Sequence, residues 1–315
     1  MARAVTFHRS HGTTRTLVSF VTAPVDALLE QLGWAASLTA AGPRPDGHVI
    51  GSHLEGPFLS HARCGAQNTA HLILPDRAAF ARMSEAAAGT LRSVTIAPEL
   101  PGAIELVKDV TASGAVAAIG HSDATYAEAR AAIDAGASLA THLFNGMRPL
   151  HHREPGLVGA ALESEIACEL INDGVHVHPS VTSLVAQRPG RMALITDAID
   201  ATGVGDGEYV LGGQRVQVAG GEARLATTGS LAGSTLTMDE SVRNAVLRSG
   251  LSIESASRAA SANPARILGI QHEVGQIQSG LAADLVVLDD DLHVTNVMAA
   301  GTWSRAAAST TRDGR

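Results

Sequence analysis

The chain has 315 residues, of which 45% are hydrophobic, and this length accommodates one barrel of about 250 residues with an appended element. Its formal net charge of -8 argues against nucleic-acid and anionic-membrane partners, because those partners require a basic surface. The sequence has no apolar stretch of the about 18 residues that a membrane span needs, and its first residues lack the core of a signal peptide, so we expect a cytoplasmic protein.

Apolar runs and helical patterns alternate along the first two thirds of the chain. After the end of a helix at residues 2–11, strands are expected at 15–21, 49–54, 93–97, 115–120, 138–141, 167–172 and 192–196. Helices are expected between most of them, at 25–41, 76–88, 103–113, 126–135 and 179–186. This alternation predicts a parallel sheet closed into a (β/α) barrel.

The last third of the chain predicts additions to that barrel. Short β runs in a Gly-rich stretch predict a hairpin insert at about residues 203–234. Helices follow at 237–249 and 253–260, and Asn263-Pro264 opens a third, short helix. The expected division is a barrel over 1–274, part of a small β domain over 275–303, and a disordered tail over 304–315.

Four residues of ligand or acid-base type each stand where an apolar run ends: Glu55, His121, His142 and Asp197. One such residue alone is more often a hydrogen-bonded core or capping residue. Four at equivalent positions favour a catalytic site, because the C-terminal ends of barrel strands form the catalytic face.

The first three of these residues are a ligand set for one divalent metal ion. A carboxylate with two imidazoles favours Zn²⁺ and also accommodates other first-row ions. The ion would lower the pKa of a bound water toward about 7, leaving Asp197 as the candidate general base. A buried or capping acid is the alternative interpretation of Asp197.

Six motifs occur in one order over nearly the whole chain: HLEGPF at 53–58, GHS at 120–122, THLFNGM at 141–147, DGVH at 173–176, TDA at 196–198 and SLAGS at 230–234. Together they resemble the N-acetylglucosamine-6-phosphate deacetylases of the amidohydrolase superfamily. The resemblance implies a TIM-like (β/α)8 metal-dependent hydrolase. Its expected reaction converts N-acetylglucosamine 6-phosphate to glucosamine 6-phosphate and acetate, in amino-sugar catabolism and cell-wall recycling.

The resemblance also implies substrate contacts and a homodimer. Arg153 matches the phosphate-binding arginine that the family supplies across the dimer interface, and a solvated surface arginine is its alternative interpretation. His176 matches a histidine that can polarise the acetyl carbonyl. The other implied contacts to the phosphorylated amino sugar are Ala66, Gln67, Asn145, Gly146, Asp173, Leu231, Ala232 and Gly233.

The chain departs from this family at its beginning. Relatives start with half of the small β domain and a first barrel strand, which in many members ends in a His-x-His pair that can hold a second metal. Met1 falls in what resembles the helix after that strand. We therefore expect a seven-stranded barrel with one open gap, a remnant of the small β-sandwich domain, and one metal per subunit. Either the true start lies upstream of Met1 or the gene is shortened, and we favour the former.

Two other functions stay open. The first is an inactive remnant that binds a sugar phosphate or a partner subunit, which predicts bound metal without turnover. The second is an amidohydrolase acting on a different amide. Arg153 and the loop at 145–147 argue against it, because a neutral substrate gives no reason for a phosphate clamp.

Overall fold

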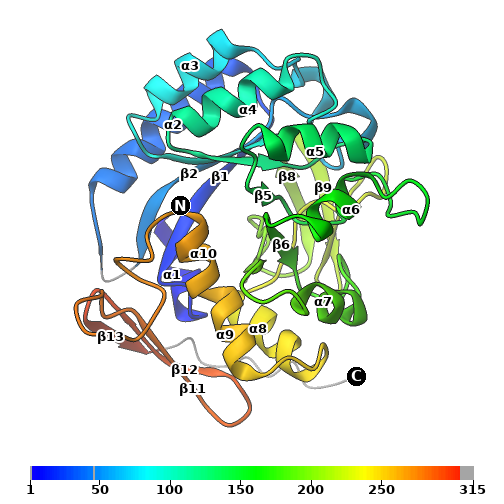
Figure 1. Ribbon diagram of the computed structural model, residues 1–315. Coiled ribbons are helices and arrows are strands. Elements are labelled where there is room, and N and C mark those ends of the chain that lie inside the picture. Colours follow the sequence, from blue (N-terminus) through cyan, green and yellow to red (C-terminus); the bar gives the residue numbers. More distant parts are fainter. Residues whose placement is uncertain (1, 45–46, 306–315) are drawn as a thin grey trace.

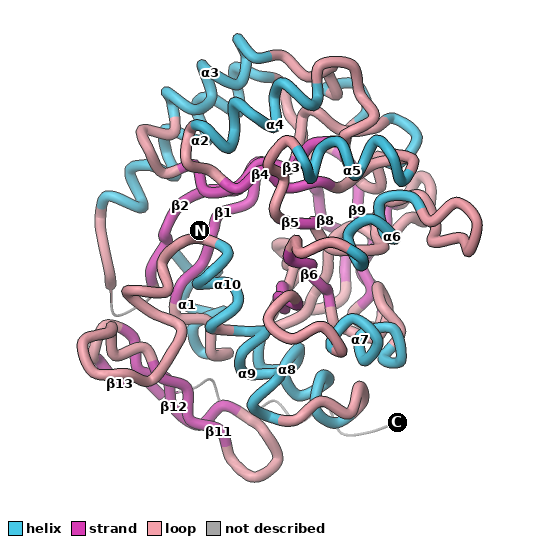
Figure 2. The backbone as a smooth tube through the Cα atoms, viewed as in Figure 1, coloured by secondary structure: helices cyan, strands magenta, loops and turns pink. Residues whose placement is uncertain are grey.

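A computed structural model describes residues 2–44 and 47–305 of the chain (Figure 1). Its centre is a curved parallel sheet of seven strands, hydrogen-bonded in chain order. The strands are β1 (Arg15–Val21), β2 (His48–Glu55), β3 (Leu91–Ile96), β4 (Val116–Ile119), β5 (Leu139–Ala140), β6 (Ala167–Ile171) and β7 (Met192–Ile195). In the described part of the chain β7 does not pair with β1, so the predicted barrel of seven strands with one open side is confirmed. Figure 2 shows how the strands from β1 to β6 curve around the interior.

Helices lie outside the curved sheet (Figure 1). They are α2 (Val25–Ala40), α3 (Arg77–Ala86), α4 (Ala103–Ala112), α5 (Tyr126–Asp134), α6 (Gly156–Glu163), α7 (Pro179–Ala186), α8 (Met238–Leu247), α9 (Ile253–Ala260) and α10 (Ala262–Ile267). Helix α2 shows why these segments are helical: Leu28, Leu32 and Ala35 recur at helical spacing, and all three are fully buried. Among the described residues, no helix combines the length and apolarity of a membrane span.

The inside of the sheet carries polar side chains, whereas its outer face packs apolar ones against the helices. The ring of His53 on β2 lies between Ser19 on β1, 3.2 Å from Oγ, and Thr95 on β3, 2.8 Å from Oγ1. Thr95 in turn lies 2.8 Å from the hydroxyl of Thr141. Fully buried Leu28, Leu54, Leu106 and Leu170 form part of the apolar core. This division leaves a polar interior below the C-terminal strand ends.

Helix α1 (Ala2–Ser10) bridges the open side of the barrel. It leads into β1, while the Phe7 ring contacts Gly203, beyond the end of β7. His11 Nδ1, just after α1, lies 3.0 Å from Asp239 Oδ2 of α8. Within the described residues the sheet has two unpaired edge strands, β1 and β7. Helices α9 and α10 pack against β7, and Asn263 Nδ2 donates a 2.7 Å hydrogen bond to the main-chain carbonyl of Met192 on that strand.

Two antiparallel sheets complete the described part of the chain. The first joins β8 (Gly207–Leu211), β9 (Gln214–Ala219) and β10 (Glu222–Leu225), where the sequence predicts only a hairpin. The third strand forms because side chains of β9 and β10 bury each other, including those of Val216, Val218, Ala223 and Leu225.

The second sheet joins β11 (Leu285–Leu288), β12 (Val294–Ala299) and β13 (Thr302–Arg305). The prediction of a disordered tail over 304–315 is wrong at its first residue, because Ser304 pairs with Val297 in this sheet. The rest of that expected tail, residues 306–315, lies outside the described residues.

Candidate metal centre and active site

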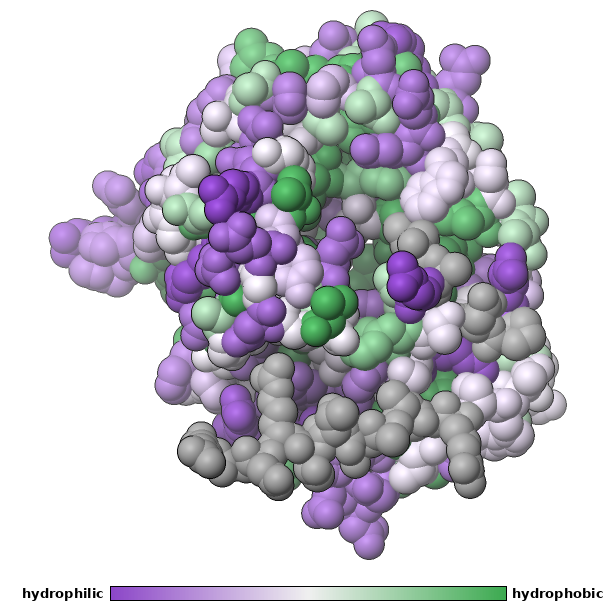
Figure 3. All heavy atoms as spheres, turned by 180° about the vertical axis from the view of Figure 1, so that it is seen from behind, coloured by the Kyte–Doolittle hydropathy of each residue, from purple (hydrophilic) through white to green (hydrophobic). Residues whose placement is uncertain are grey.

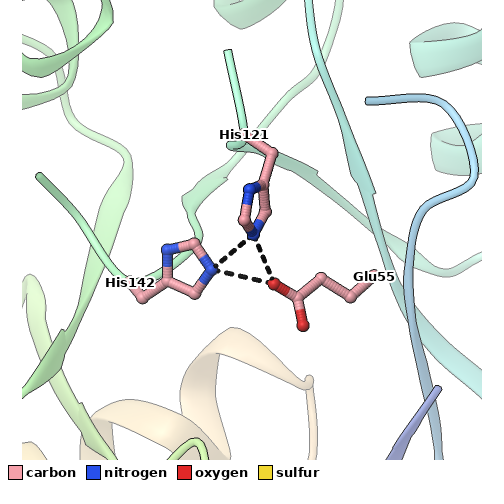
Figure 4. A group of neighbouring side chains, drawn as sticks. All are labelled: Glu55, His121 and His142. Carbon is pink, nitrogen blue, oxygen red and sulfur yellow. Dashed lines mark hydrogen bonds and ion pairs between the residues drawn. The ribbon is translucent and has the colours of Figure 1, made fainter. Parts of the chain in front are cut away.

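The side chains of Glu55, His121 and His142 converge on one point at the C-terminal ends of β2, β4 and β5 (Figure 4). Glu55 Oε1 lies 2.7 Å from His121 Nε2 and 2.9 Å from His142 Nε2, and the two Nε2 atoms are 3.1 Å apart. All three residues are buried. Ligand atoms on a tetrahedral zinc ion, at bonds of about 2.0–2.1 Å, lie about 3.3 Å from each other. The three donors therefore fit a divalent metal ion.

The backbone at these strand ends is left-handed, which is uncommon for residues with side chains. His121 has φ 47°, His142 has φ 29° and Asp197, at the end of β7, has φ 49°. Each such conformation costs about 1–3 kcal/mol and persists only where neighbouring contacts fix it. Strain at three strand ends in one region is a mark of a functional site.

Contacts with the β2–α3 loop, residues 56–76, set the orientation of His121. Nδ1 of the ring lies 3.0 Å from the carbonyl oxygen of Arg63, so Nδ1 carries a proton and Nε2 is the ring nitrogen that faces the metal position. The ring is held between two glycines: a Cβ on Gly65 would lie 3.1 Å from its Cε1, and a Cβ on Gly146 would lie 2.7 Å from Nδ1.

Glu55, His121 and His142 form a buried hydrogen-bonded cluster in this structure. Burial raises the pKa of Glu55, but its hydrogen bonds with His121 and His142 outweigh burial and hold that pKa well below its usual value. Burial lowers the pKa of His142, but the hydrogen bond and charge of Glu55 prevail and raise it to about 9. At neutral pH, His142 in the metal-free protein therefore carries a proton that a metal must displace.

Metal binding is accordingly expected to release about one proton from His142 below pH 9. Because the pKa of His142 is raised to about 9, metal affinity should rise about tenfold per pH unit from pH 7 toward 9 and level off above it. Calorimetric titration of the metal-free protein with Zn²⁺, in buffers of different protonation enthalpy, measures both effects. An affinity that stays constant between pH 7 and 9 would mean that His142 is already neutral.

Asp197 and His176 face the same cavity as the three ligands. Burial and the nearby charge of Glu55 raise the pKa of Asp197, which improves it as a proton acceptor near neutral pH. His176 is oriented by Asp173, whose Oδ2 lies 2.7 Å from its Nδ1 and whose Oδ1 accepts its main-chain N–H at 2.8 Å. The free ring nitrogen of His176 is therefore Nε2.

The cavity around these groups has a volume of about 1810 Å³. Seen from behind, the molecule is hollowed near its centre, with hydrophilic and hydrophobic residues mixed around the hollow (Figure 3). The expected substrate residues that line this cavity are Ala66, Gln67, Asn145, Gly146, His176, Leu231 and Gly233. Oε1 of Gln67 also accepts the main-chain N–H of Thr22 at 2.7 Å, which ties the β2–α3 loop to the end of β1.

Three expected substrate residues, Arg153, Asp173 and Ala232, are not in the lining of the cavity. Arg153 is exposed on the loop before α6, where its guanidinium contacts the ring of His152 at 2.8 Å. Ala232 is fully buried in the apolar cluster of the β8–β10 sheet. Asp173 reaches the site through its contact with His176.

Residues 1–304 match the amidohydrolase family. The chain belongs to this family. It is 39% identical over 294 residues to an N-acetylglucosamine-6-phosphate deacetylase of Bos taurus, covering 90% of this chain and 71% of that protein. It is 40% identical over 292 residues to an N-acetylgalactosamine-6-phosphate deacetylase of Escherichia coli, covering 92% of this chain and 77% of that protein.

Solved structures agree with this family assignment. An Asp-to-Ala variant of the N-acetyl-D-glucosamine-6-phosphate deacetylase of Mycobacterium smegmatis, in complex with N-acetyl-D-glucosamine-6-phosphate, superposes with a TM-score of 0.92 at 47% identity, covering 96% of this chain and 79% of that chain. The N-acetylglucosamine-6-phosphate deacetylase of Thermotoga maritima superposes with a TM-score of 0.90 at 34% identity, covering 96% of this chain and 82% of that chain. The resemblance inferred from the six motifs is confirmed.

Sequence reasoning missed one acidic residue of this amidohydrolase site. Glu169 lies in the middle of β6 and lines the cavity. Burial raises its pKa to about 7. The available signal was an acid inside the otherwise apolar run at 167–171.

Gly56, next to Glu55, is required by the geometry of this amidohydrolase site. Its φ is +106°, and a Cβ there would lie 2.2 Å from Thr22 Oγ1. Gly56→Ala is expected to lower the free energy of unfolding by about 2–5 kcal/mol and to weaken metal binding, because relief of the clash moves Glu55.

Gly42→Ala is the matched control for the Gly56 substitution, since Gly42 also has positive φ, +70°, but has nothing within 4 Å of its Cβ position. Thermal unfolding and bound-metal measurements compare the two variants. Equal losses of stability and of bound metal in both variants would show that the backbone conformation, and not the contact with Thr22, makes Gly56 necessary.

Proposed function

We propose that this chain is a metal-dependent deacetylase that hydrolyses N-acetylglucosamine 6-phosphate to glucosamine 6-phosphate and acetate. The observation that carries the proposal is the convergence of Glu55, His121 and His142 on one point of a cavity that Asp197 also lines. The family membership and the names of the relatives described above supply the substrate class. Neither the family membership nor these relatives favour an inactive remnant or an amidohydrolase that acts on a different amide.

The residues of the cavity have distinct roles in the proposed reaction. Glu55, His121 and His142 would hold one divalent ion, for which Zn²⁺ is the favoured identity, and that ion would lower the pKa of water to near 7 and so supply a nucleophile. Asp197 takes the proton of the attacking water and passes it to the departing amine. His176, held by Asp173, turns Nε2 toward the acetyl carbonyl and stabilises the charge that develops on its oxygen.

The sugar is expected to lie against residues that line the cavity around the three ligands. Asn145 offers a side-chain amide, and Gly146 offers main-chain groups beside His121. Ala66, Gln67, Leu231 and Gly233 complete the proposed contact set. Ala232 is omitted from it, because its side chain is buried away from the cavity.

We further propose that the chain acts as a homodimer in which Arg153 clamps the phosphate bound to the partner subunit. Arg153 is exposed and does not line the cavity of its own subunit, so it is available to a partner subunit. The substrate phosphate needs a local positive charge, because the protein as a whole is acidic. A phosphorylated sugar as substrate supports a cytoplasmic location.

Arg153→Ala is expected to raise KM for N-acetylglucosamine 6-phosphate roughly 10- to 100-fold and to leave KM for N-acetylglucosamine unchanged, because a hydrogen bond between charged groups contributes about 1.5–3 kcal/mol. Steady-state kinetics on both substrates test this expectation. Arg130→Ala, at a partly exposed arginine of α5 that pairs with Asp134, is the control. Equal effects on both substrates would exclude the phosphate clamp.

The experiment that tests the function is acetate release from N-acetylglucosamine 6-phosphate by the purified chain after reconstitution with Zn²⁺ and quantification of bound metal. N-acetylgalactosamine 6-phosphate should be assayed in parallel, because one similar relative is named for that sugar. Release of acetate in proportion to bound metal supports the proposal. Stoichiometric metal without acetate from either sugar contradicts it.

A further inference from the structure

Glu169 contacts the segment that carries His142 at two points. It lies in the middle of β6, which pairs with β5, and it faces the cavity. Its carboxylate Oε2 accepts the main-chain N–H of His142 at 3.4 Å. Its main-chain carbonyl accepts the N–H of Leu143 at 2.8 Å. One residue therefore binds two successive peptide N–H groups at the metal centre.

The segment around His142 needs such support more than the other strand ends do. The preceding strand, β5, has only two residues, so the sheet holds little of this segment. His142 has φ 29° and Phe144 has φ 81°, which places two left-handed residues within three positions. Backbone of this kind keeps its conformation only where neighbouring groups determine it. Glu169 provides two of those groups.

The imidazole of His142 also has an unused donor or acceptor. Its Nδ1 is buried, is turned away from Glu55, and has no hydrogen-bond partner among the described residues (Figure 4). Nδ1 of His121, in contrast, contacts the carbonyl of Arg63. Metal-binding histidines usually donate this second N–H to a carboxylate, a carbonyl or a water. Glu169 supplies a carboxylate to this residue from β6, since its Oε2 lies 3.4 Å from the main-chain nitrogen of His142.

We propose that Glu169 is a positioning residue of the metal centre, which fixes the main chain of His142 and, through one water, provides the acceptor for its Nδ1–H. This inference rests on the proposed metal-dependent function. Glu169 does not bind the ion in this arrangement; it sets the direction in which Nε2 of His142 points. Its contribution should therefore appear in metal affinity before it appears in turnover.

The test compares Glu169→Gln and Glu169→Ala with the unchanged chain by chelator competition for Zn²⁺. The Ala variant is expected to raise the Kd for Zn²⁺ about 10- to 100-fold, as loss of an outer partner of a ligand does. The Gln variant keeps an acceptor oxygen of the same reach, so a smaller rise is expected. At saturating metal both variants should recover most of kcat, with KM unchanged. Glu165→Ala, at an exposed acid just before β6, is the control.

The outcomes separate this proposal from a structural role and from the proposed function. An unchanged Kd for Zn²⁺ in both variants would overturn it, even if their melting temperatures fall. If the Ala variant does not fold, the Kd of the Gln variant decides. Metal affinity is measured without substrate, so a chain that binds Zn²⁺ but releases no acetate contradicts the deacetylase function and still tests Glu169.

Discussion

Asp197→Asn is expected to lower kcat about 10²- to 10⁴-fold, the usual contribution of a general base, while bound metal stays at the level of the unchanged chain. The amide has the volume of the carboxylate but cannot accept the proton of the attacking water. Asp197 is not one of the three converging ligands, so its replacement leaves the metal position intact. Steady-state kinetics together with metal quantification measure the two effects separately.

The control for this substitution is Asp200→Asn, at an exposed aspartate three residues further along the chain. This variant also removes one carboxylate from the loop after β7, but it leaves the proposed base in place, so its kcat should equal that of the unchanged chain. An Asp197→Asn variant that keeps the kcat of the original chain would exclude Asp197 as the base.

His121→Ala is expected to lower metal affinity more than about 100-fold and to abolish measurable turnover, because loss even of an outer partner of a ligand costs about 10- to 100-fold. The chain should remain folded, since Glu55 keeps its contact with His142 at 2.9 Å. Metal quantification after gel filtration and circular dichroism measure binding and folding. His151→Ala, at an exposed histidine, is the control, and a metal-replete His121→Ala chain would contradict the assignment of the ligands.

The sequence was sufficient to predict the strand ends that carry the site. Glu55, His121 and His142 each follow an apolar run, and parallel strands bring their C-terminal ends to one face. The seven strands were predictable from the same apolar runs. These predictions depend on local periodicity and on a rule of barrel topology, whereas the open side was expected from the resemblance, because the first barrel strand of the family has no counterpart in this chain.

Other features depend on tertiary contacts and left no pattern to find. Helix α6 escaped prediction because Gly156, Leu157, Val158, Ala160 and Ala161 are all buried, so it has no polar face to reveal a helical period. The third strand of the β8–β10 sheet forms only when its side chains meet those of β9. Likewise, the contact of Glu169 with His142 spans two strands and is invisible in either segment alone.

The coverage of β7 affects whether a second molecule can add a strand to the open sheet. An edge strand with free peptide groups is a template on which a second molecule can add a strand, and such pairing leads to aggregation. On β7 the carbonyl of Met192 is already occupied by the side chain of Asn263, and α9 and α10 lie against the strand. This border of the unclosed sheet is thereby partly covered, because an incoming strand would meet the Asn263 side chain at Met192 and the helices that pack against β7.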